Sequence, residues 1–201
     1  MSIAVVDYKA GNLKSVENAL QYLGVNHFIS DYPDKLRQGD KLIFPGVGHA
    51  KAAMDKLQSS GIAEMLKEYA SSGKAMMGIC LGSQILLDHS EEGNTALLGI
   101  IPGKTKLFKS DELKIPHIGW NQVNPAIRHP LFEGIPDGSS FYFVHSYYTV
   151  PDKAENTLCR TEYGELFTSG ICQDNVCAVQ FHPEKSGKWG LKMLENFSKK
   201  L

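Results

Sequence analysis

The sequence lacks the features that mark membrane, secreted and nucleic-acid-binding proteins. Its apolar runs are all far shorter than the roughly 20 residues that a membrane-spanning helix needs. The first residues lead into an apolar strand without a positively charged segment, so we expect no signal peptide. The 21 basic and 22 acidic residues give a net charge of −1, which provides no basic surface for nucleic acid. We therefore expect neither a membrane nor nucleic acid among its partners.

Cysteine is also scarce, and its four positions show no C-x-x-C spacing (Cys80, Cys159, Cys172 and Cys177). Because closely spaced pairs of ligands are the usual sign of a zinc site, we expect no metal, and no motif calls for another cofactor. Unpaired cysteines favour free thiols in a reducing compartment, so the expected location is the cytoplasm. Cys159, Cys172 and Cys177 lie in strand patterns and are expected to be small core residues.

What the sequence does contain is the alternation of an α/β protein. Its 201 residues, without a repeat or a linker, predict a single domain over residues 1–201. In the first half, apolar strands alternate with helical periodicity, which indicates a mostly parallel, doubly wound central sheet with helices on both faces. Strands are expected at 3–6, 25–30, 42–44 and 75–79, and helices at 13–23, 50–57 and 62–71.

The C-terminal half has a different sequence pattern, in which short apolar segments are separated by Gly, Pro, Asn and Asp. Such punctuation predicts additional antiparallel strands on the same sheet. A closing amphipathic helix is expected over 187–198. The strand candidates are 104–108, 120–123, 141–144, 147–150, 158–161, 166–172 and 176–181.

One stretch in the centre of the chain carries the first sign of chemistry. Residues 75–79 form a continuous apolar strand, and Cys80 follows in the sequence G-x-C-x-G, with a helical segment behind it. This is the cysteine version of the nucleophile elbow, in which Gly78 and Gly82 are expected to permit a sharp bend and close approach of a substrate. The field at a helix N-terminus would favour the thiolate. By itself, the motif fits a buried structural cysteine equally well.

A cysteine nucleophile needs a base, and the segment FHPE supplies candidates near the C-terminus. His182 can hold the thiolate as an ion pair and later protonate a leaving amine, and Glu184 can orient the imidazole. The residue before a proline favours extended backbone, so His182 and Glu184, two positions apart, are expected to point the same way. Taken alone, the segment fits an ordinary surface loop.

The loop PGVG at 45–48 follows a strand, and its glycines could aim backbone N–H groups at an anionic intermediate. A plain turn is the alternative. A phosphate-binding loop is disfavoured because neither G-x-G-x-x-G nor G-x-x-x-x-G-K is present.

Together, these segments resemble the class I (triad) glutamine amidotransferases over nearly the whole chain. The marks of the family are PGVGH at 45–49, GICLGSQ at 78–84 and QFHPEKS at 180–186. PHIGWN at 116–121 and YFVHSY at 142–147 resemble one branch, the glutaminase subunits of imidazole glycerol phosphate synthases. Family members commonly carry Met where this chain has Ser83, a position without a catalytic role.

The resemblance implies a flavodoxin-like fold and the hydrolysis of glutamine to glutamate and ammonia through a Cys80 thioester. His182 and Glu184 would complete the triad, and the N–H groups of Val47 and Leu81 would form the oxyanion hole. The expected glutamine contacts are Gly48, Gln84, Ser146 and Tyr147.

In this branch, ammonia passes to a (β/α)₈ synthase subunit that forms imidazole glycerol phosphate and AICAR in histidine biosynthesis. That subunit would be a separate chain and a heterodimer partner, since 201 residues are too few for both domains. The residues expected at this interface are Asn12, Trp120, Tyr142 and Lys185.

Two alternatives remain open at this point. One is a paralogous triad amidotransferase that feeds ammonia to a different synthase. The other is a cysteine amidohydrolase that acts alone on a small γ-glutamyl compound, which would be active without any partner. A non-catalytic binding domain is disfavoured, because Cys80, His182 and Glu184 are all intact.

Overall fold

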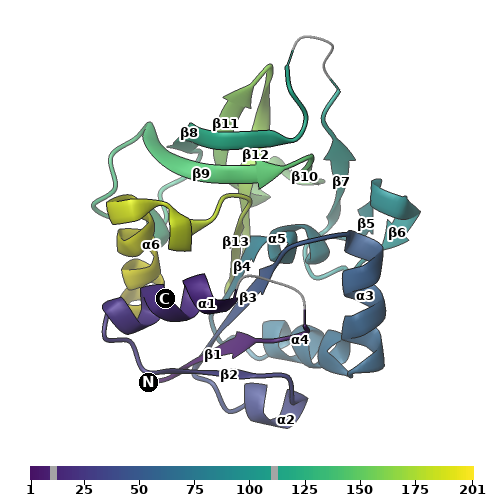
Figure 1. Cartoon of the computed structure of the whole chain (residues 1–201), viewed down its shortest axis with the longest axis vertical. Coiled ribbons are helices and arrows are strands. Elements are labelled where there is room, and N and C mark those ends of the chain that lie inside the picture. Colours follow the sequence, from purple (N-terminus) through teal and green to yellow (C-terminus); the bar gives the residue numbers. More distant parts are fainter. Residues whose placement is uncertain (10–12, 110–112) are drawn as a thin grey trace.

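A computed structural model describes residues 1–9, 13–109 and 113–201. Five parallel strands form one half of the sheet, in the order β2 (His27–Ser30), β1 (Ile3–Val6), β3 (Lys41–Gly46), β4 (Met76–Cys80) and β13 (Val176–Val179) (Figure 1). The register pairs Gly46 with Cys80, so β3 and β4 end at the same edge. This half confirms the predicted parallel sheet. Strand β13 corrects one expectation: the sequence groups it with the added antiparallel strands, but it pairs parallel with β4 and antiparallel only with the strand Glu165–Gln173.

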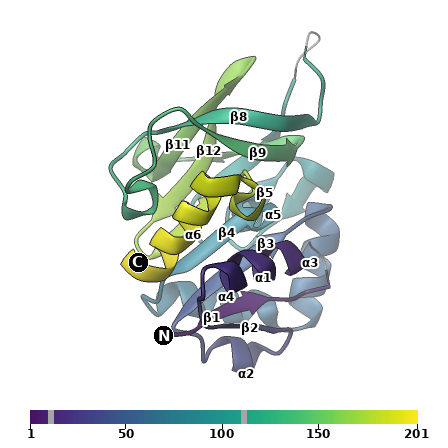
Figure 2. The same cartoon turned by 60° about the vertical axis from the view of Figure 1, so that its left-hand side comes forward.

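The helices cover both faces of these strands because neighbouring strand residues point to opposite sides. On β1, Ile3 and Val5 belong to one core cluster, while Ala4 and Val6 belong to the other. The first cluster packs against α1 (Leu13–Tyr22) and α6 (Gly187–Lys200), which lie side by side (Figure 2). The second packs against α2 (Pro33–Leu36), α3 (Ala50–Ser59), α4 (Ile62–Ser71) and α5 (Leu81–Ile85).

The C-terminal half adds the antiparallel strands that the sequence predicts. The sheet continues from β13 through β12 (Glu165–Gln173), β10 (Tyr147–Pro151), β7 (Gly103–Leu107), β5 (His89–Ser90) and β6 (Thr95–Ala96). The pairs in this half are antiparallel, except that β5 and β7 run parallel. A branch leaves β12 through β11 (Thr157–Tyr163) to β8 (His117–Pro125) and β9 (Ser139–His145). The short elements α2, β5 and β6 were not predicted.

The described helices are each too short or too polar to cross a membrane.

A buried lysine ties the first strands to the last helix. Lys41 begins β3 and is only 3% exposed. Its Nζ donates hydrogen bonds to the carbonyl oxygens of Phe197 (2.9 Å) and Ser198 (2.6 Å) in the last turn of α6. The last four carbonyls of a helix have no partner within the helix, and a cation there is favoured by the helix dipole. Lys41 therefore caps α6.

We expect Lys41→Met to lower the free energy of unfolding by about 1–3 kcal/mol, because buried carbonyls lose a charged donor. Urea denaturation monitored by circular dichroism measures the change. Lys104→Met on β7 is the matched control, since this side chain is exposed and should alter stability by less than about 0.5 kcal/mol. Equal stability of the two variants would contradict the capping role.

Candidate active site

The backbone at Cys80 has an unusual conformation. Cys80 lies where β4 ends and α5 begins, with φ 55° and ψ −112°. A positive φ is costly for a residue with a Cβ, and such outliers cost on the order of 1–3 kcal/mol. Buried Ser83, whose hydroxyl donates to the Cys80 carbonyl oxygen at 2.7 Å, helps to hold this turn. The predicted sharp turn at Cys80 is confirmed.

The two glycines of the motif have a different role from the one expected. The bend falls on Cys80 itself, and neither Gly78 nor Gly82 has a positive φ. A Cβ on Gly82 would lie 2.0 Å from the carbonyl oxygen of Phe44, and one on Gly78 would lie 2.9 Å from that of Gly82. The expectation that these glycines supply the bend is therefore wrong, while close approach of a substrate stays a prediction. They let the turn pack closely against β3 and against itself.

His182 and Glu184 form a buried pair. Nδ1 of His182 is 2.7 Å from Oε1 of Glu184, and both side chains are 2% exposed. His182 has the expected extended backbone (φ −102°, ψ 95°). Glu184, however, lies in a 3₁₀ turn over Pro183–Lys185. This turn, and not a continued extended segment, brings the carboxylate to the ring.

The electrostatics of this pair favour an imidazolium. Burial disfavours the charged ring, but the interactions of the ring with Cys80 and Glu184 outweigh burial and raise the pKa of His182 well above its ordinary value. Nε2 of His182 is buried and has no hydrogen-bond partner among the described residues. Nε2 is therefore the ring nitrogen left to exchange a proton at the site.

A cavity of about 300 Å³ opens beside Cys80. Every oxyanion and glutamine residue expected from the sequence lies in its wall. Gly48 has φ 103°, so the chain turns on this glycine and not on Val47. The described residues contain no group of three or more side chains that could hold a metal ion. The wall consists of Val47, Gly48, Cys80, Leu81, Gln84, Glu92, Pro116, Val144, His145, Ser146 and Tyr147.

Two glutamine side chains, those of Gln84 and Gln180, connect this wall to Sγ of Cys80. The side-chain Nε2 of Gln84 donates to the carbonyl oxygen of Tyr147 (3.1 Å) and to Oε1 of Gln180 (2.9 Å). Nε2 of Gln180 in turn lies 3.8 Å from Sγ of Cys80. Gln180 and the wall residues His145 and Glu92 were not singled out from the sequence. For Gln180 and His145 the available signal was their place inside the motifs at 180–186 and 142–147.

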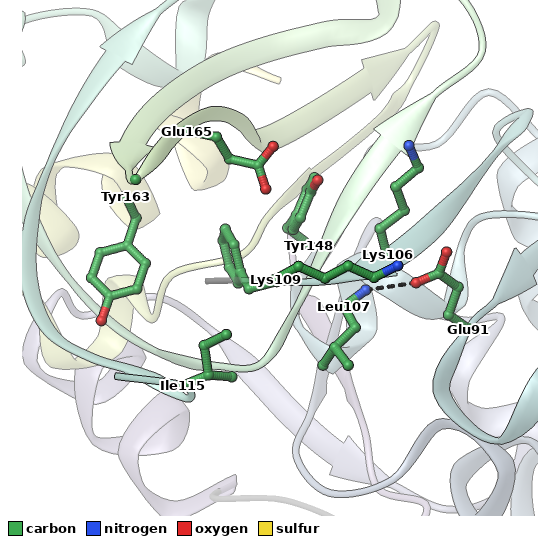
Figure 3. A pocket seen from close by; sticks show the side chains of 10 residues that line it. Glu91, Lys106, Leu107, Lys109, Ile115, Tyr148, Tyr163 and Glu165 are labelled. Carbon is green, nitrogen blue, oxygen red and sulfur yellow. Dashed lines mark hydrogen bonds between the residues drawn. The ribbon is translucent and has the colours of Figure 1, made fainter. Parts of the chain in front are cut away.

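A second cavity, of about 380 Å³, lies between β7, β10 and the turn from β11 to β12 (Figure 3). Lysines and glutamates of opposite charge line it, among them Lys106, Lys109, Glu91 and Glu165. The Leu107 N–H donates to Oε2 of Glu91 at 2.9 Å across its edge (Figure 3). It contains no residue of the triad, so the cavity beside Cys80 is the candidate active site.

Three residues expected at a partner interface lie together next to the triad. Trp120 and Tyr142 are register partners on β8 and β9, with ring centroids 6.2 Å apart, and Lys185 Nζ lies 6.0 Å from the Tyr142 ring. Trp120 is 58% exposed, and Ile118 on the same face is 57% exposed. The His182 N–H donates to the Tyr142 carbonyl oxygen at 2.9 Å. The fourth residue, Asn12, lies outside the described residues.

The other cysteines are buried in the core, as predicted. Burial raises the pKa of Cys159 and of Cys177 to about 12, and also raises that of Cys172. Their thiols therefore stay protonated at neutral pH, which leaves Cys80 as the candidate nucleophile.

The backbone strain at Cys80 can be tested separately from chemistry. We expect the Cys80→Gly variant to be more stable than Cys80→Ala by about 1 kcal/mol, because glycine relieves the positive φ. Ala52 is the control, since it is exposed within α3 and ordinary helical geometry favours alanine over glycine. Ala52→Gly should therefore be destabilising. Chemical denaturation measures all three, and a Cys80→Ala variant as stable as Cys80→Gly would refute the strain.

Comparison with known proteins agrees with this geometry. The family described as Glutamine amidotransferase class-I matches residues 4–201. The chain is 46% identical to the imidazole glycerol phosphate synthase subunit HisH of Sulfurimonas denitrificans, covering 98% of this chain and 97% of the relative. It is 48% identical to the HisH subunit of Methanosarcina acetivorans, covering 97% and 96%.

Among solved structures, PurLQS from Thermotoga maritima matches with a TM-score of 0.75 and 21% identity, covering 98% of this chain and 96% of that one. This likeness shows the fold. The family match and the relatives show more: this chain belongs to the class I glutamine amidotransferases.

Proposed function

We propose that this chain is the glutaminase subunit of an imidazole glycerol phosphate synthase, with residues 1–201 acting as one amidotransferase domain in the cytoplasm. The observation that carries the proposal is the placement of Cys80, in its strained turn, beside the buried His182–Glu184 pair at the edge of a small cavity. The HisH relatives, similar over nearly their whole length, support the choice of branch.

In the proposed reaction, the Cys80 thiolate attacks the side-chain amide carbon of glutamine. The C–N bond breaks, the His182 imidazolium gives its proton to the leaving nitrogen, and ammonia departs from a γ-glutamyl thioester. Neutral His182 then takes a proton from water as it attacks the thioester. The C–S bond breaks, and glutamate and the thiolate result. Glu184 holds the ring through Nδ1 and stabilises its charge at each stage.

The negative oxygen that forms in each tetrahedral intermediate would be held by the N–H groups of Leu81 and Val47. Leu81 is the first residue of α5, and Val47 follows the end of β3. One such donor is typically worth roughly 10²–10³-fold in rate. The substrate would lie against Gly48, Gln84, Ser146 and Tyr147, which share the cavity wall.

The proposed partner is a (β/α)₈ synthase subunit that receives the ammonia and forms imidazole glycerol phosphate and AICAR. The exposed aromatic Trp120, together with Tyr142 and Lys185, suits the centre of a protein interface. Tyr142 is bonded through its backbone to His182, so this surface adjoins the site where ammonia is released. Asn12 is also proposed for the interface on the resemblance alone.

We expect Cys80→Ala to abolish the release of glutamate from glutamine, because no other group can form the thioester. The variant should still bind the synthase subunit, and the pair should still make imidazole glycerol phosphate from added ammonium. Loss of labelling by a glutamine-like chloroketone checks the nucleophile. Labelling that persists at Cys159, Cys172 or Cys177 would identify a different one.

We expect Glu184→Gln to reduce kcat/KM less than His182→Ala, whose loss should be about 10²–10⁴-fold. Glutamine can still accept a hydrogen bond from Nδ1, but it lacks the charge that raises the pKa of His182. Without that charge the imidazolium loses its proton at lower pH, so the alkaline limb of the pH profile should move to lower pH. Equal small losses for both variants, with unchanged pH profiles, would exclude the His182–Glu184 pair from catalysis.

A further inference from the structure

Two buried histidines beside the cavity have no part in the reaction described above. His117 on β8 and His145 on β9 are register partners, 3% and 6% exposed. Nδ1 of His117 lies 3.0 Å from Nε2 of His145. Only His145 reaches the cavity wall, so His117 acts from behind it. Rings of Tyr163 and Phe143 stack on His117, with centroids 3.9 and 4.9 Å away.

The hydrogen bonds at one end of this pair fix where its protons lie. Nδ1 of His145 is 2.8 Å from the carbonyl oxygen of Tyr147, two residues along the chain. Because a carbonyl oxygen can only accept, Nδ1 of His145 must carry the proton. A neutral His145 then has a bare Nε2, and His117 must donate to it through its own Nδ1.

The hydrogen bonds at the His117 end of the pair indicate the same proton positions. Nε2 of His117 is left as an acceptor, and Nδ2 of Asn121 lies 3.3 Å away. The orientation of the Asn121 amide is set independently: Nδ2 donates to the carbonyl oxygen of Glu162 (2.9 Å), and Oδ1 accepts from the Gln122 N–H (2.8 Å). Each polar atom in this series of hydrogen bonds therefore has a partner of the right kind when both rings are neutral.

The surroundings favour the neutral rings as well. Burial lowers the pKa of His145 to about 3 and that of His117 to about 4. The hydrogen bond to the Tyr147 carbonyl oxygen raises the pKa of His145, whereas the nearby His117 and His182 lower it further. No carboxylate is hydrogen-bonded to either ring among the described residues, in contrast to the Glu184 that stabilises a charged His182.

This series of hydrogen bonds ends at the carbonyl oxygen of Tyr147, which accepts from two different parts of the structure. The carbonyl oxygen of Tyr147 accepts from Nδ1 of His145 and from Nε2 of Gln84, and it lies directly after Ser146 on the cavity wall. We propose that His117 and His145 are positioning residues, both neutral with the proton on Nδ1, which hold the Ser146–Tyr147 edge in the shape that receives glutamine. This inference builds on the proposed glutaminase function.

The kinetic test uses His117, because this ring stays out of the cavity and can act only through His145. His117→Phe keeps an aromatic ring for stacking but removes the donor to His145, and it should raise KM for glutamine about tenfold with kcat changed less than about threefold. His117→Asn can place its amide donor near the position of Nδ1 and should restore KM to within about threefold of the parent. Glutamate release by the complex with the synthase subunit provides both constants.

His129→Phe is the matched control, because this histidine is partly shielded but caps a 3₁₀ turn away from the cavity, and its KM should equal the parent value. An unchanged KM in His117→Phe would overturn the proposal, as would a loss confined to kcat or an equal loss in His117→Asn. A parent complex that releases no glutamate would instead refute the proposed function.

The proton positions give a test that needs no variant to be active. Long-range ¹H–¹⁵N spectra of the histidine-labelled chain at pH 7 should show His117 and His145 neutral with the proton on Nδ1, although free imidazole rings prefer Nε2. The signals lost in His117→Asn and in His145→Asn assign the two rings. Either ring found charged, or protonated on Nε2, would overturn the proposal even if the kinetic variants are inactive.

Discussion

The conformation of Cys80 is the constraint on which the rest of the site depends. A positive φ at a residue with a Cβ persists only where its surroundings leave no alternative. Here β4 is paired on both sides, Gly82 packs against the Phe44 backbone, and the Ser83 hydroxyl holds the Cys80 carbonyl oxygen. The strands on either side of β4 then position the other residues of the site. Parallel strands end at one edge, so β3 delivers Val47 and β13 leads to His182, one on each side of the sulfur.

The three histidines near Cys80 are similarly buried, but their partners favour different charge states. His182 has a carboxylate at 2.7 Å, so a proton on its ring is stabilised in a medium of low dielectric constant. His145 and His117 have a carbonyl, an amide and each other, which satisfy neutral rings only. A second imidazolium beside His182 would repel the charge on which proton transfer to the leaving group depends. The proposed arrangement would keep a single mobile proton at the site.

The sequence was most informative where local chemistry decides the outcome. The parallel strands, the main helices, the turn at Cys80 and the wall position of the expected oxyanion and glutamine residues could be predicted from periodicity, glycine placement and motif resemblance. The roles of Gly78 and Gly82 could not, because the atoms that fill the space of their missing Cβ come from Phe44, Ala178 and the turn itself. Gln180, His117 and His145 were passed over for a similar reason: Gln180 pairs with Gln84 and His117 pairs with His145 across 96 and 28 residues of sequence, and only the folded chain brings them together.

Strand β8 connects the two surfaces on which the proposed function depends. Side chains alternate along a strand, so Ile118 and Trp120 face outward while His117 and Asn121 face the core. A partner that packs on Trp120, as proposed, would therefore contact the same strand that carries the donor to His145. A displacement of β8 would alter the hydrogen bond to His145 and, through it, the edge at Ser146 and Tyr147. With both rings neutral, as proposed, such a displacement would change the shape of the pocket and leave its charge unchanged.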